Sequence, residues 1–253
     1  GGDKDPIFMG RDDNLLSLED GNIDNDLLEV LKEARGKVDI VTVGSLRDVA
    51  ALYNNATDLF ENKVDKIWIF AGDAEGTIKE YNVGLDELAF LRIMNSGKLN
   101  IFWIPCFQNG IWTKGTNTSY ITVTHSEIFE NIDSNLLKWF MYRYEKSNVD
   151  FQDYVLDEHN ISIFMNEVRN LWCAPLFPLI NDSMTDWIKR YNEECGRNIS
   201  LPFGFEKRKV TFLEGGTVVY GKGNEINVFK VYNNDEYEAF SIFILKCIFS
   251  EFL

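Results

Sequence analysis

Apolar residues along this chain form either short continuous runs or runs with helical spacing. The continuous runs predict buried strands at 37–43, 67–70 and 100–105, because a strand covered on both faces of a sheet is apolar at successive positions. Helical spacing, as at Leu27 and Leu31, predicts helices between and after these strands. Strands that alternate with helices imply parallel pairing with right-handed crossovers. The predicted helices cover residues 24–34, 46–52, 85–94, 136–145, 161–170, 185–194 and 236–252.

Other segments have the pattern of loops or paired strands. Residues 210–220 and 228–232 alternate between apolar and polar positions, which predicts a hairpin or an edge pair of strands. Residues 109–126 are rich in Thr, Asn and Gly and predict a long loop that could cover a site or carry short strands. Residues 1–24 are polar and predict a loop or arm. Without an internal repeat or a recognisable linker, the sequence predicts a single α/β domain over residues 1–253.

Charge and hydropathy exclude two classes of partner. The formal charge is −15 and the pI about 4.6, so we expect neither a nucleic acid polymer nor a membrane as partner. Residues 240–252 are too few to span a bilayer and include Lys246 and Glu251. No signal peptide is recognisable, which gives slight weight to a cytoplasmic location, whereas sequons such as Asn55 keep a secretory route open.

The four cysteines, Cys106, Cys173, Cys195 and Cys247, form no CxxC pair. Three of them lie in apolar runs, so the sequence favours buried free thiols. A disulfide pair is less favoured, and a zinc site is the least favoured of the three. A nucleophilic role for Cys173 is the less favoured reading, because its flanks are apolar and no histidine is near in sequence. His125 could be a general acid, although a surface or capping histidine is favoured, and Trp103 could stack on a base or pack in the core.

The candidate chemistry lies in Glu80 and Asn82, two positions apart after the predicted strand 67–70. Polar groups just past the carboxyl ends of parallel strands are where ligands bind in α/β sheets. A carboxylate accepts hydrogen bonds and a carboxamide both donates and accepts, which suits a vicinal diol such as that of a sugar. The alternative is that both residues belong to the start of a helix, where the dipole favours Glu and Asn caps.

Six short segments follow one another in an order that is typical of one enzyme family. They are 41–50 (VTVGSLRDVA), 68–72 (WIFAG), 80–87 (EYNVGLDE), 95–105 (NSGKLNIFWIP), 215–220 (GGTVVY) and 227–232 (NVFKVY). In this order they resemble the nucleoside hydrolase family of the inosine–uridine-preferring type, over residues 25–253. The resemblance implies a mostly parallel α/β sheet flanked by helices. It also implies hydrolysis of the N-glycosidic bond of ribonucleosides.

The resemblance assigns roles to four residues. Glu80 and Asn82 fall on ribose-binding positions, and Phe70 falls on a residue that lies under the sugar. Val43 falls where the family supplies a backbone carbonyl to a Ca²⁺ ion, a hard cation that prefers oxygen ligands. In that family an Asp-activated, metal-bound water attacks the anomeric carbon. The implied ligand is a nucleoside or another ribosyl small molecule.

Two departures from the family pattern concern its carboxylates. The Asp-x-Asp-x-x-x-Asp-Asp motif that supplies the base and most metal ligands is absent, and residues 10–16 match its second half only superficially. Cys173 or Ala174 stands where a late metal-binding Asp is expected, and 73–76 is shortened. The sequence therefore predicts a sheet that lacks the family's first strands, and it leaves the catalytic residues unassigned.

These departures leave two functions open. One is a divergent nucleoside N-ribohydrolase that is inactive or needs a complementing N-terminal segment. The other is a non-catalytic binding or assembly subunit that keeps the fold, as a homo-oligomer or with another partner.

Overall fold

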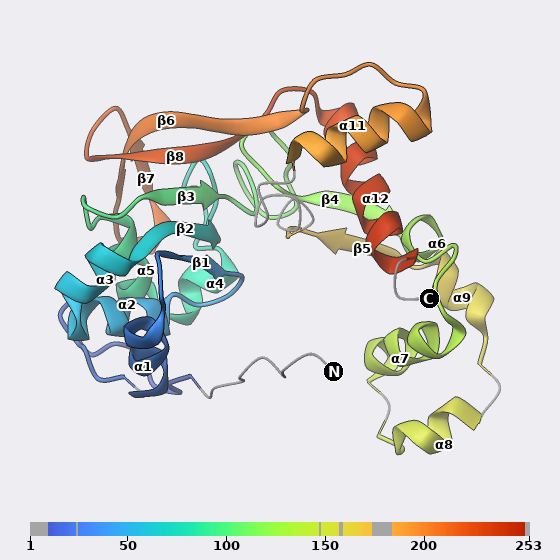
Figure 1. Cartoon of the computed structure of the whole chain (residues 1–253), viewed down its shortest axis with the longest axis horizontal. Coiled ribbons are helices and arrows are strands. Elements are labelled where there is room, and N and C mark those ends of the chain that lie inside the picture. The colour runs from blue at the N-terminus through green and yellow to red at the C-terminus, as the bar shows by residue number, and fades with distance from the viewer. Residues whose placement is uncertain (1–9, 24, 147, 157–158, 174–183, 251–253) are drawn as a thin grey trace. The chain divides into compact units, whose positions relative to one another are not determined.

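A computed structural model of the chain describes residues 10–23, 25–146, 148–156, 159–173 and 184–250 (Figure 1). The chain forms two compact units. The first unit comprises Gly1–Ser119 and Gly204–Val231, and the second comprises Tyr120–Phe203 and Tyr232–Leu253. The single domain expected over residues 1–253 stays a prediction.

A six-stranded sheet forms the centre of the first unit, in the order β1-β2-β3-β8-β6-β7. The pairs β1·β2, β2·β3 and β3·β8 are parallel, and β6·β7 is antiparallel. This mostly parallel, helix-flanked sheet confirms the predicted fold class. The strands are β1 (Val38–Thr42), β2 (Val64–Phe70), β3 (Ile101–Ile104), β6 (Phe203–Phe212), β7 (Val218–Tyr220) and β8 (Asn224–Val231).

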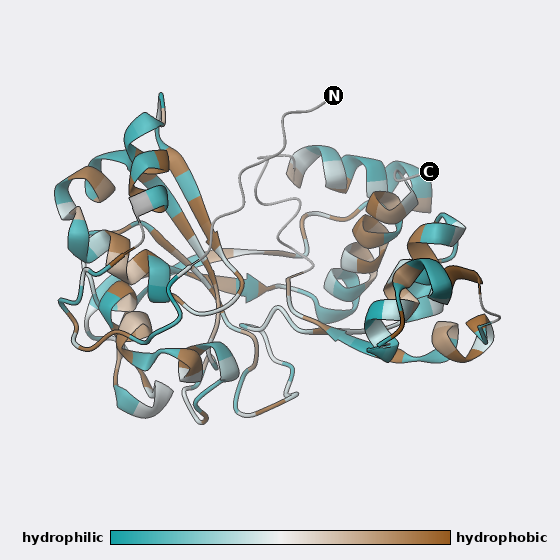
Figure 2. Cartoon of the chain, turned by 90° about the horizontal axis from the view of Figure 1, so that it is seen from below, coloured by the Kyte–Doolittle hydropathy of each residue, from teal (hydrophilic) through white to brown (hydrophobic). Residues whose placement is uncertain are grey.

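The helices of the first unit each contribute buried apolar residues to one core that they share with the sheet. Ile67 and Ile69 of β2 and Trp103 of β3 are fully buried and pack in one core with residues such as Phe60 and Phe90. Along these helices hydrophobic and hydrophilic stretches alternate, as expected for half-buried helices (Figure 2). The helices are α1 (Asn25–Glu33), α2 (Arg47–Asn55), α3 (Thr57–Lys63), α4 (Tyr81–Leu85) and α5 (Glu87–Met94).

The second unit is mainly helical with one antiparallel strand pair, β4 (Ile121–Thr124) and β5 (Val168–Leu171). The long helix α12 (Asn234–Ser250) packs against β4 and two other helices of this unit. None of the helices in the described part of the chain is long and apolar enough to cross a membrane. The other described helices are α6 (His125–Ile128), α7 (Ser134–Glu145), α8 (Phe151–Leu156), α9 (Ile161–Asn166) and α11 (Met184–Cys195).

Two predicted elements differ from the structure. The predicted helix 161–170 ends at Asn166, because the residues that follow pair with β4 as strand β5. The predicted strand 210–220 is broken by a 3₁₀ turn in which Gly215 has a φ of 76°. The chain therefore reverses there, so that β7 pairs with β6 and β8 enters the sheet between β3 and β6.

Candidate site at the carboxyl end of the parallel strands

The chain turns sharply where β2 ends, at Gly72. This residue has a φ of 90°, a left-handed conformation that only glycine adopts without strain. Its N–H donates to Oε2 of Glu80 at 2.9 Å, and its carbonyl accepts from the N–H of Cys106 at 2.9 Å. A Cβ at this position would lie 3.5 Å from the Trp103 ring. Gly72 thus joins the end of β2 to the loop after β3 and to the Glu80 carboxylate.

Glu80 precedes α4 and is almost completely buried, with 5% of its surface exposed. Its backbone is extended and its side chain makes no capping hydrogen bond to the helix. The carboxylate is instead turned toward the end of β2, where it accepts the N–H of Gly72. The side chain of Glu80 therefore does not cap the helix, which was the alternative role for this residue.

Asn82 is anchored to the same strand end. Its Nδ2 donates to the carbonyl of Phe70 at 3.2 Å, and its side chain is half-buried. The ring of Phe70 is 1% exposed and belongs to the interior. The structure therefore brings Glu80, Asn82 and Phe70 together through hydrogen bonds to the backbone at the end of β2.

Val43 follows the neighbouring strand β1, and its side chain is 56% exposed. Thr42, the last residue of β1, is paired with Ile69 of β2. The carbonyl of Val43 therefore lies beside the end of β2, at the same edge of the sheet as the anchored residues. Its assigned role toward a metal ion stays a prediction.

Asp73, which the local sequence favours as a residue of a solvated loop, is instead a buried structural residue of this edge. It is 1% exposed and accepts four backbone N–H groups. Oδ1 accepts from Glu75 at 3.0 Å, from Thr77 at 3.3 Å and from Asn109 at 3.3 Å, and Oδ2 accepts from Gly110 at 2.7 Å. Asp73 thereby ties the loop after β2 to the loop after β3. Its position directly after Ala-Gly at a strand end was the available sequence signal.

A second buried carboxylate fixes the helix that follows the candidate residues. Asp86 is 2% exposed and caps α5 by accepting the N–H of Ala89 at 3.1 Å. It also accepts the N–H of Leu15 at 2.8 Å and the Nε–H of Arg47 at 3.4 Å. The Arg47 guanidinium in turn donates to the carbonyl of Asp12 at 2.6 Å. Residues 10–23 are therefore a loop held against α5.

The described residues do not form a calcium cage. Among them no three His, Cys, Asp or Glu side chains gather into a group that could hold a metal ion. Both oxygens of Asp73 are occupied by backbone N–H groups, and Ca²⁺ needs about six to eight oxygen ligands. The Ca²⁺ ion that the family resemblance implies stays a prediction.

The described cysteines form no disulfide; Cys106 and Cys247 are buried as expected, whereas Cys173 is partly exposed and Cys195 is exposed. Burial raises the pKa of Cys173 to about 11, so this thiol is protonated at neutral pH. A thiol in that state is neither a nucleophile nor a ligand for a hard cation. Ala174, the other residue at the position of the late Asp, lies outside the described residues.

Two further candidates turn out to be interior residues. Trp103 is fully buried and its Nε1–H donates to the carbonyl of Ala71 at 2.7 Å, so its ring is not open to a base. His125, expected at the surface or in a cap, is 2% exposed. Thr124 and Glu127 form the capping box of α6, while Nδ1 of His125 lies 2.8 Å from the carbonyl of Phe164. Burial lowers the pKa of His125, which favours the neutral ring.

Comparison with solved structures shows the fold to be nucleoside-hydrolase-like. The chain is similar to a plant nucleoside hydrolase with a TM-score of 0.50 and 15% identity, over 87% of this chain and 65% of that enzyme. An inosine–uridine preferring nucleoside hydrolase from Bacillus anthracis gives a TM-score of 0.43 and 14% identity, over 87% of this chain and 64% of that one. The type III effector protein XopQ complexed with adenosine diphosphate ribose gives a TM-score of 0.44 and 15% identity, over 89% of this chain and 65% of that one.

This chain thus spans about 65% of the length of the plant enzyme. Neither the profiles of known protein families nor the sequences of curated proteins match it. At these identities the structural likeness establishes the fold alone.

Proposed function

We propose that this chain binds a ribosyl-containing small molecule, such as a nucleoside, at the carboxyl end of β1 and β2. The observation that carries the proposal is the placement of Glu80. Its carboxylate is nearly buried at the strand end, and the described residues give it one hydrogen bond, from Gly72 to Oε2. Oε1 therefore stays available to accept a hydroxyl of a ligand.

Asn82 supplies the complementary polarity. Its anchor to Phe70 uses one N–H of the carboxamide, so the second N–H and Oδ1 remain for a ligand. A donor and an acceptor beside a carboxylate match the vicinal hydroxyls of ribose, each of which both donates and accepts. The formal charge of −15 disfavours phosphorylated ligands, so we expect nucleosides to bind better than nucleotides.

Hydrolysis of the N-glycosidic bond would require more than ligand binding. By the mechanism of the family it requires carboxylates that hold a cation and activate water. The described residues do not gather such carboxylates. We therefore propose ligand binding as the function of this chain, and hydrolysis as an activity that would need carboxylates from elsewhere. The same reasoning supports the non-catalytic binding subunit as the alternative.

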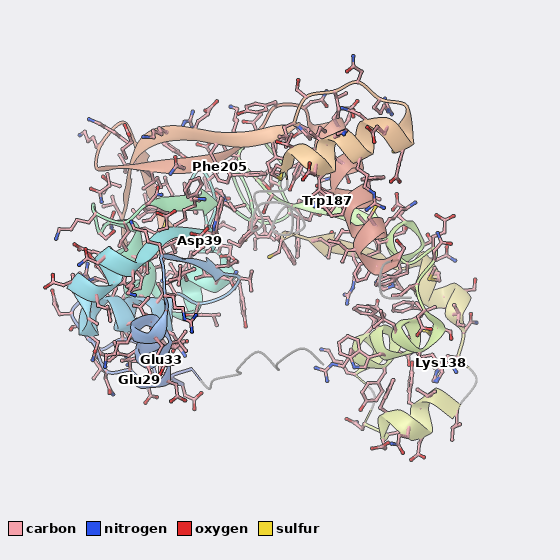
Figure 3. The ribbon with its side chains drawn as sticks, in the orientation of Figure 1. Glu29, Glu33, Asp39, Lys138, Trp187 and Phe205 are labelled. Atoms are coloured by element: carbon pink, nitrogen blue, oxygen red, sulfur yellow. The ribbon has the colours of Figure 1, made fainter. Side chains whose placement is uncertain are left out.

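Calorimetric titration of the full chain with inosine and uridine, with and without Ca²⁺, tests the proposal. Glu80→Gln and Asn82→Ala should each weaken binding roughly tenfold, which corresponds to about 1.4 kcal/mol for a lost hydrogen bond. Glu29→Gln is the matched control, because Glu29 lies on α1 and pairs there with Lys32 at the exposed surface (Figure 3). Binding that survives both site variants unchanged would contradict the assignment, as would a folded chain that binds neither nucleoside.

Release of nitrophenol from a nitrophenyl riboside separates the two outcomes for catalysis. Turnover that depends on Ca²⁺ and on Glu80 would establish the hydrolase. Ribosyl binding without turnover would establish the binding subunit. The binding titration and the turnover assay can fail independently of each other.

A further inference from the structure

The second unit contains a cavity of about 230 Å³ that the proposed ribosyl site does not involve. Its walls come from α6, α7, α9, β5 and α12, all of which belong to this unit (Figure 1). Most of its lining is apolar, and aromatic rings are the largest part of it. These apolar walls are Ile128, Phe129, Phe140, Phe164, Leu245 and Phe249.

The rings of the wall are packed against one another and so form a defined surface. Phe129 stacks on Phe140 at 4.9 Å between ring centres, and lies nearly parallel to Phe164, with 10° between the planes. Phe249 meets Phe129 edge to face at 5.0 Å. Such a wall favours a planar aromatic guest, since ring edges and faces then meet in the arrangements that aromatic pairs prefer.

One wall of the cavity carries a cation. Arg169 on β5 is exposed, and its guanidinium carbon lies 4.5 Å from the centre of the Tyr144 ring. Among the described residues no carboxylate lies within ion-pair distance of it, and the carboxylate of the nearby Glu167 accepts the hydroxyl of Tyr144 at 2.9 Å. A guanidinium held over an aromatic ring offers its N–H fork to a planar anion such as a carboxylate.

The lining has two other polar residues, Tyr144, whose hydroxyl donates to Glu167, and His125, which does not compete for that anion. His125 spends Nδ1 on the carbonyl of Phe164, which can only accept, so Nδ1 carries the hydrogen. Burial favours its neutral form. Arg169 is therefore the positive group of this cavity.

We propose that the cavity of the second unit binds a small aryl carboxylate, with the ring among the phenylalanines and the carboxylate on Arg169. The size agrees with one substituted ring, since a cavity of ~150 Å³ lined by aliphatic and aromatic side chains already admits benzene. This inference is independent of the ribosyl site in the first unit.

Phenylacetate, 2-phenylethanol and benzylamine are the probes, because they share a ring and differ in charge. Methyl NMR of the full chain follows Ile128, Leu171 and Leu245, which line the cavity. We expect phenylacetate to shift these signals with a Kd on the order of 1 mM or tighter. 2-Phenylethanol should bind about tenfold more weakly and benzylamine more weakly still. Equal affinities for the three probes would overturn the role of the cation, and no shift with any of them would overturn the site.

Arg169→Gln should weaken phenylacetate binding about tenfold and leave 2-phenylethanol unchanged. The matched control is Arg190→Gln on α11, because Arg190 also lies over an aromatic ring, that of Trp187, but outside the cavity. Ile128→Phe, which adds volume at the wall, should weaken all probes. Should that variant not fold, the methyl shifts of the unmodified chain still locate the ligand. Phenylacetate binding that Arg169→Gln leaves intact would refute the proposal.

Discussion

Replacing Asp73 by asparagine would change one atom of a buried carboxylate on which four backbone N–H groups converge. In the variant one oxygen becomes an NH₂ group, which donates instead of accepting. The remaining oxygen can serve the three donors that Oδ1 now serves. The NH₂ group then faces the N–H of Gly110, which lies 2.7 Å from Oδ2 in the native chain. At least one part-buried N–H donor therefore loses its acceptor.

The loss of stability can be estimated from the number of N–H donors that lose their acceptor. A buried donor left without a partner costs about 1–3 kcal/mol. Asp73→Ala removes the acceptor of all four N–H groups, so its cost should be larger, about 3–5 kcal/mol, which is in the upper range for single substitutions. Since 1.4 kcal/mol changes an equilibrium tenfold, Asp73→Asn should raise the population of locally open loops by about ten- to a hundredfold.

Hydrogen exchange followed by mass spectrometry measures this opening directly. Peptides that cover 73–80 and 107–113 should exchange faster in Asp73→Asn, because Asp73 holds both loops, whereas peptides from α2 should keep their rates. Asp65→Asn is the matched control: Asp65 makes a surface ion pair with Lys37 at 3.7 Å, and its loss should change stability by less than about 1 kcal/mol. Unchanged protection of both loops in Asp73→Asn would refute the reasoning.

Two substitutions and one labelling experiment test other parts of the structure. Gly72→Ala places a Cβ on a residue with a φ of 90°, and should lower the melting temperature by about 2–10 °C; an unchanged temperature would show that the turn relaxes freely. Hydrogen bonding and charge from Arg11 hold the pKa of Asp20 at about 2, so this pair stabilises the fold above pH ~4 and the contribution fades toward pH 2. Asp20→Asn should therefore destabilise the chain in urea at pH 7 more than at pH 2, and an equal loss at both would contradict the linkage. Cys173, its pKa raised by burial to about 11, should react with iodoacetamide at pH 8 more slowly than the exposed Cys195; equal rates by mass spectrometry would disprove this.

The parallel strands could be predicted because the signal for them is local. Strands β2 and β3 are buried on both faces, and a run such as Ile67–Phe70 shows this in four consecutive residues. Strand β5 has no such signal, since Val168 and Arg169 are exposed. It is a strand because it pairs with β4, some 47 residues earlier in the chain, and that partner is not visible in the local pattern. The preceding helix was accordingly predicted to continue too far.

The candidate site likewise contains residues that the local sequence locates and a residue whose role depends on distant contacts. Glu80 and Asn82 could be located because they are close in sequence and follow a recognisable strand. The function of Asp73 depends on Asn109 and Gly110, which are more than 30 residues away. A solvated loop aspartate and a buried loop organiser have the same local sequence, and only the tertiary contacts distinguish them.

The anchors of Glu80 and Asn82 bear on what a ligand would gain at this site. Each side chain makes one hydrogen bond to the backbone at the end of β2. Its remaining donor and acceptor groups are not bonded to described residues. A side chain already fixed by such a bond and by burial loses little rotamer freedom when a ligand arrives, so more of the interaction energy is retained as affinity. This requires the end of β2 itself to be rigid. The hydrogen bonds of Gly72 to Glu80 and Cys106 and the four N–H groups held by Asp73 fix that strand end. Substitutions at these two residues should therefore weaken the proposed ribosyl binding without removing any atom that would touch the ligand.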